Sequence, residues 1–77
     1  RRLSALLFFV SAHAIGAQPP CDRPAAEVAI DAAWTSWRAN AIARADSLFR
    51  RGAQLCPGAA QAWTGLGYVA MRRDSIR

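Results

Sequence analysis

The chain has 77 residues, a formal net charge of +5 and ten basic residues that are all arginines. Without Arg1 and Arg2, residues 18–77 carry eight arginines against five acidic residues, a net charge of +3. These arginines are dispersed rather than gathered into a basic stripe, which argues against nucleic-acid binding. The sixty residues after position 17 are also too few to bury a large core on their own.

Residues 1–17 have the pattern of a secretory signal peptide. Two arginines open the chain, an apolar run follows over residues 3–10, and small residues come next. The apolar run is shorter than the roughly 20 residues that a transmembrane helix requires. We therefore expect export, with cleavage after Ala17 or, as second choice, after Ala14. An uncleaved membrane anchor is the alternative.

The next segments predict an extended leader and two helices. Residues 18–24 contain three prolines and are predicted to be extended. Over residues 25–39 apolar side chains recur at three- and four-residue spacing, which predicts a helix. A turn is expected at residues 40–41, since Asn tolerates unusual backbone angles. In the second helix, over residues 42–55, the side chains expected to be buried are Ala45, Leu48, Phe49 and Ala53.

A third helix completes the all-α prediction. The second helix ends at residues 56–58, Cys-Pro-Gly, because proline cannot continue the hydrogen-bond ladder and glycine favours a cap. The third helix is predicted over residues 60–73. Asp74 or Ser75 would then cap a further helix.

Small, aromatic and stop residues follow one another in a recognisable order across these helices: Ala45, Phe49, Pro57, Trp63, Leu66 and Gly67. This order resembles the tetratricopeptide repeat (TPR), a 34-residue helix–turn–helix unit whose copies stack into a curved solenoid. Two positions depart from the family pattern. Ala70 stands where an aromatic residue is usual, and Gly52 is a weaker helix former than the usual small residue.

The chain also repeats itself at the period of that family. A shift of 34 residues aligns Ala33 with Gly67, Trp34 with Tyr68, Arg38 with Arg72, Asn40 with Asp74 and Ile42 with Ile76. The resemblance implies an incomplete all-α solenoid, with one repeat over 25–59 and a truncated second repeat over 60–77. Because about three repeats are needed to bury a continuous core, we expect an N-terminal fragment of a longer protein. An ordinary amphipathic helical hairpin is the alternative.

The resemblance also implies a binding surface for a protein or peptide. First helices of related repeats line a concave groove, and the residues at those positions here are Trp34, Arg38, Tyr68 and Arg72. Trp, Tyr and Arg dominate the energetics of protein interfaces. Trp37 and Met71 also fall on groove-lining positions, with burial against a neighbouring repeat as the alternative. Phe49 and Trp63 match core positions of the family.

No catalytic constellation is visible, so we expect a protein that is not an enzyme and needs no cofactor. The single histidine, His13, lies in the predicted signal peptide. Cys21 and Cys56 alone are too few ligands for a zinc site. An even number of cysteines in an exported chain favours a disulfide, and the two ends of a helical hairpin lie side by side, within the Cα separation of about 5.5 Å that a bridge requires. Two unpaired thiols are the alternative.

These features together predict an exported bacterial scaffold for protein–protein interaction or assembly, in the periplasm or cell envelope. The use of arginine without any lysine is typical of a GC-rich bacterial genome. Two other interpretations stay open. The repeats are the N-terminal module of a larger exported enzyme or outer-membrane β-barrel protein, or they belong to a signal-anchored membrane protein.

Overall fold

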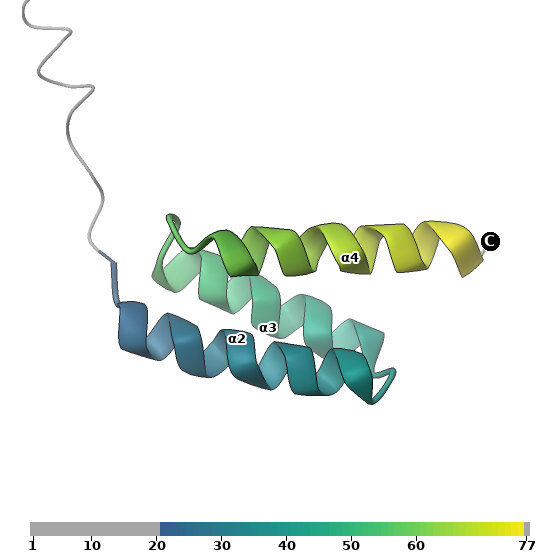
Figure 1. Cartoon of the computed structure of the whole chain (residues 1–77), viewed down its shortest axis with the longest axis horizontal. Coiled ribbons are helices and arrows are strands. Elements are labelled where there is room, and N and C mark those ends of the chain that lie inside the picture. The colour runs from purple at the N-terminus through teal and green to yellow at the C-terminus, as the bar shows by residue number, and fades with distance from the viewer. Residues whose placement is uncertain (1–20, 77) are drawn as a thin grey trace, which may run out of the picture.

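The computed structural model describes residues 21–76 as three helices, with no strand in this range. Helix α2 spans Arg23–Arg38, α3 spans Ile42–Leu55 and α4 spans Ala60–Ile76. Each helix runs antiparallel to the one before it, so α2 and α4 point the same way and α3 runs opposite to both (Figure 1). The predicted all-α class is confirmed.

The helix bounds agree with the sequence prediction except at the two ends. α3 has the predicted bounds, and α2 begins two residues earlier than expected, at Arg23. The prediction that Asp74 or Ser75 caps a further helix is wrong, because α4 continues through both to Ile76. No Gly or Pro interrupts its last turns, and the Ser75 hydroxyl donates to the Arg72 carbonyl inside the helix (3.0 Å). The predicted signal peptide over 1–17 lies outside the described residues.

Helix α2 begins with a conventional cap. The Asp22 carboxylate accepts a hydrogen bond from the Ala25 N–H (3.1 Å), and Pro24 occupies the first turn, where a missing N–H costs nothing. The Asp22 N–H itself donates to the carbonyl of Leu55, at the end of α3 (2.9 Å). The start of α2 and the end of α3 are therefore joined through backbone atoms.

The turn between α2 and α3 is a Schellman motif centred on Asn40. Asn40 has a φ of 64°, the left-handed conformation that the sequence analysis anticipated at this position. The Asn40 N–H donates to the Trp37 carbonyl (2.9 Å) and the Ala41 N–H to the Ser36 carbonyl (2.8 Å). These two bonds satisfy carbonyls that the end of α2 would otherwise leave unpaired.

The core is built from one large ring surrounded by small side chains. Phe49 is completely buried, and most of its buried neighbours are alanines: Ala26, Ala33, Ala45, Ala53, Ala59 and Ala62. Two glycines bring the backbones closer still. A Cβ on Gly52 would lie 2.7 Å from Cγ1 of Ile30, and a Cβ on Gly65 would overlap the Phe49 ring. The helices are thus packed at a separation that larger residues would not permit.

Alanine substitutions at two glycines of α4 test this packing. We expect Gly65→Ala to lower the free energy of unfolding by about 1–3 kcal/mol, because the buried Phe49 ring has no space to move into. Gly67→Ala is the matched control, since a Cβ there meets no atom within 4 Å. It should raise stability by up to about 1 kcal/mol through helix propensity. Thermal unfolding followed by circular dichroism measures both, and a neutral Gly65→Ala would contradict the packing argument.

Candidate functional site

Three aromatic rings from α2 and α4 form a continuous cluster. The Trp34 ring packs edge-on against Phe49, with centroids 4.8 Å apart, and also against Tyr68 at 5.7 Å. Trp37, one turn further along α2, lies 5.8 Å from Tyr68. Edge-to-face pairs at these separations are favourable beyond the area they bury. Trp34 therefore connects the buried core to a surface on which Tyr68 remains 46% exposed.

Arg72 holds the last turns of α4 against this cluster. Its guanidinium lies 4.8 Å from the centroid of the Trp37 ring, in cation–π contact. The same group donates to Oδ1 of Asn40 in the α2–α3 turn (2.5 Å). Arg72 is therefore only partly exposed, and its charge is already directed at groups within the chain.

The structure brings together three of the four residues assigned to the groove from the sequence. Trp34 contacts Tyr68, and Tyr68 and Arg72 line the same depression. Arg38 is exposed and, among the described residues, makes a single long bond (3.4 Å) to the hydroxyl of Thr35 on its own helix. The contact of Trp37 with both Tyr68 and Arg72 was not anticipated. This contact could have been predicted from the sequence, because Trp37 follows Trp34 by three residues and so lies on the same side of α2.

We call the depression between α2 and α4 the groove; it has two recesses of different character. The near recess, beside the start of both helices, is lined mainly by polar side chains and includes Arg23, Glu27, Asp31 and Gln61. The far recess, beside their ends, is lined by Trp37, Tyr68, Met71, Arg72 and Ser75. Met71, which is 67% exposed, thus belongs to the groove rather than to a buried contact in the described chain.

A second surface lies on the other side of α4. The prediction that Trp63 occupies a core position is wrong for the described chain, because 54% of its surface is exposed. Its indole N–H donates to the carbonyl of Pro57 (2.8 Å), which holds the ring beside the α3–α4 turn. Gly67 and Ala70 continue this exposed face along the helix. Because these positions are spaced by three and four residues, they form one stripe.

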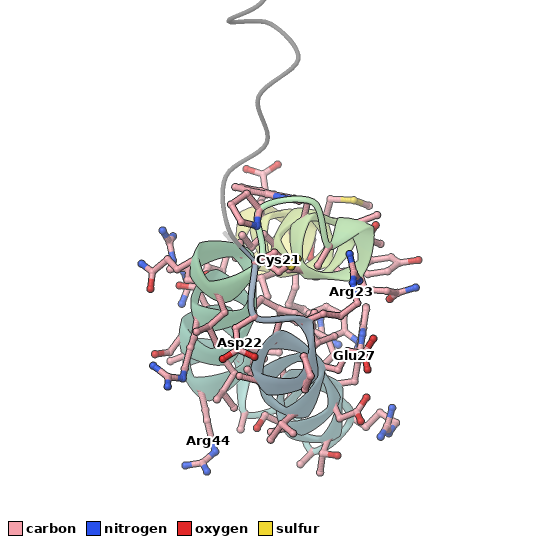
Figure 2. The ribbon with its side chains drawn as sticks, turned by 90° about the vertical axis from the view of Figure 1, so that its left-hand side faces the viewer. Cys21, Asp22, Arg23, Glu27 and Arg44 are labelled. Carbon is pink, nitrogen blue, oxygen red and sulfur yellow. A yellow bond between two sulfur atoms is a disulfide. The ribbon has the colours of Figure 1, made fainter. Side chains whose placement is uncertain are left out.

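The two cysteines are paired in the structure. Cys21 and Cys56 are joined by a disulfide, with their Cα atoms 4.4 Å apart. Cys56 is 1% exposed, whereas Cys21 lies at the surface, where Figure 2 shows it among the ends of the helices. Among residues 21–76, no three His, Cys, Asp or Glu side chains gather into a possible metal site. Within the same range no helix is long and apolar enough to span a bilayer.

Charged side chains away from the groove connect α3 to α4 or face solvent. Asp46 of α3 accepts from Arg50 one turn later (3.2 Å) and from Arg73 of α4 (3.3 Å). Arg44 is exposed and extends away from the helices (Figure 2). The Asp46 contacts are partly exposed ion pairs, which contribute little individually but help to fix the end of α4 on α3.

Comparison with known proteins gives no relative for this chain. No protein-family model, curated protein or solved structure matches it. The arrangement of its own residues is therefore the basis for any functional proposal.

Two arginine substitutions test the contacts at the far recess. Arg72→Ala removes the bond to Asn40 and the contact with Trp37, so we expect a loss of about 1 kcal/mol in unfolding free energy. Arg38→Ala, at the equivalent position of α2, should change stability by less than about 0.5 kcal/mol. Urea denaturation compares the two variants. Equal effects would mean that Arg72, like Arg38, is merely solvated.

Proposed function

We propose that the chain is a protein-interaction module that binds an extended peptide segment in the groove between α2 and α4. The observation that carries this proposal is the far recess, where the exposed surfaces of Tyr68 and Met71 adjoin Trp37. Aromatic side chains held in fixed positions supply large contact areas at little entropic cost. The contacts of Arg72 with Trp37 and Asn40 help to hold this recess in place.

We further propose that the helices are TPR-like repeats of a solenoid. Support comes from the difference in burial between positions that are 34 residues apart. Ala29, Ala33 and Ser36 are buried on α2, which packs most closely on α3. The corresponding positions on α4 are the exposed stripe of Trp63, Gly67 and Ala70. A further helix packed on α4 as α3 packs on α2 would cover this stripe, which is how stacked repeats build a continuous core.

The chemistry of the groove favours binding over catalysis. Its side chains offer aromatic surface, a thioether, two carboxylates and guanidinium groups. Neither recess combines a Ser, Cys or Thr nucleophile with a histidine base, the pairing that nucleophilic catalysis commonly uses. We therefore propose a scaffold rather than an enzyme, with no cofactor and with a protein or peptide as its partner.

Export to the periplasm or cell envelope of a bacterium completes the proposal. The signal-like pattern of residues 1–17 supports it. The Cys21–Cys56 disulfide is a second, independent support, because disulfides persist in oxidising compartments and are rare in the cytosol.

Peptide binding tests the groove directly. Peptides selected from a random library on the oxidised chain should lose at least about tenfold in affinity for Tyr68→Ala, because truncating an aromatic anchor removes a binding hot spot. Val28→Ala is the control, since Val28 is an apolar side chain that is 71% exposed but lies beside a different recess, between α2 and α3. Its affinity should stay within about twofold of the parent. Selected peptides that are insensitive to Tyr68→Ala would place binding elsewhere.

N-terminal sequencing tests export. The protein isolated from the envelope fraction of a bacterial host should begin at Gln18, or at Ile15 if cleavage follows Ala14. A control chain with Leu7→Arg, which interrupts the apolar run, should remain uncleaved. A parent chain that keeps its first residues would contradict the signal-peptide interpretation and favour a membrane anchor.

A further inference from the structure

The Cys21–Cys56 disulfide lies where the start of α2 meets the end of α3, and two bonds join these ends. The bridge connects Cys21, which precedes the Asp22 cap of α2, to Cys56, the C-cap residue that follows α3. Next to it, the Asp22 N–H donates to the Leu55 carbonyl (2.9 Å). One covalent and one hydrogen bond therefore hold the start of α2 against the end of α3.

The same segment also sets the direction of α4. The carbonyl of Cys56 accepts from the Ala59 N–H (2.9 Å), and the carbonyl of Pro57 accepts from the Trp63 indole (2.8 Å). Ala59 and Cys56 are both buried, at 4% and 1% exposure. The first turn of α4 is thus attached to the backbone that the disulfide anchors, and we call this region the junction.

The two walls of the groove are held together differently at its two ends. At the far end, Tyr68 and Arg72 of α4 contact Trp37 of α2, and Arg72 also bonds to the turn residue Asn40. Beside the near recess, no hydrogen bond or ion pair between described residues joins α2 directly to α4. There the two helices are positioned through the junction and through apolar contact in the core.

We propose that the Cys21–Cys56 disulfide is a redox latch for the near end of the groove. While it is closed, the starts of α2 and α4 are held at a fixed separation. When it is reduced, only the Asp22–Leu55 hydrogen bond and the core contacts hold the start of α2 against the end of α3. The near recess then widens, while the contacts of Arg72 keep the far end in place. The far recess then acts as the hinge about which α2 and α4 separate. Binding of a peptide that spans both recesses therefore becomes sensitive to thiols.

The opening step is ordinary thiol–disulfide exchange with a dithiol reductant. One thiolate of the reductant attacks Sγ of Cys21, the exposed partner, and the S–S bond breaks with Cys56 leaving as a thiolate that takes up a proton. The second thiol of the reductant attacks the mixed disulfide and releases Cys21 as a thiol. Two electrons and two protons pass to the cysteines, and the reductant ends as a disulfide.

Two interhelix distances test the latch. Spin labels attached to unnatural amino acids, which leave the cysteines free, are placed at exposed positions Glu27 and Gln61 for the near end, and at Arg38 and Ser75 for the far end. Adding a dithiol to the whole chain should lengthen or broaden the near distance by about 2 Å or more and leave the far distance unchanged. Intact mass measured before and after treatment establishes the state of the bridge.

A Cys21→Ser/Cys56→Ser double variant is the control. It should give the near distance of the reduced chain, with or without the dithiol. Two results would overturn the proposal. If neither distance changes on reduction, the bridge has no role in positioning the helices. If both distances broaden and the helical circular dichroism disappears, the bridge stabilises the whole chain and is not a local latch. Reduction of the parent chain distinguishes these outcomes even if the double variant does not fold.

Discussion

The Phe49 ring packs where the three helices meet, and its size sets how closely they approach one another. It is the largest fully buried side chain, and it requires a glycine opposite it on α4 and alanines around it. Packing of this kind influences both the separation and the register of the helices, because Gly65 has to face the ring for α4 to approach α3 so closely. Among residues 21–76 few large side chains are fully buried, so the core depends strongly on this one ring.

The position of Phe49 also decides what remains at the surface. Its edge contact with Trp34 leaves the outer side of that indole for Tyr68, and the cluster continues from there to Trp37 and Arg72. The groove is therefore an extension of the core rather than a separate feature. Changes that disturb the core ring are expected to reach the groove through Trp34, since packed interiors transmit strain.

Much of the fold was predictable because its signals are local. The bounds of α3 and the turn at Asn40 follow from hydrophobic spacing, Pro57 and the tolerance of Asn for left-handed backbone. The end of α4 was not predictable from a 34-residue shift, since a helix without a stop residue continues. Likewise, Arg38 and Arg72 are equivalent in sequence but not in environment. Only tertiary packing places Asn40 and Trp37 within reach of Arg72.

Asn40 has both a backbone role and a side-chain role in the α2–α3 turn. Its backbone is left-handed, a conformation that glycine adopts at least cost, and its side-chain oxygen accepts the bond from Arg72. Glycine would keep the turn and lose the acceptor, whereas glutamine would keep an acceptor and strain the backbone. Asparagine and aspartate alone combine tolerance of this backbone with a short oxygen-bearing side chain. Fewer residue types should therefore be tolerated at position 40 than its exposure to solvent suggests.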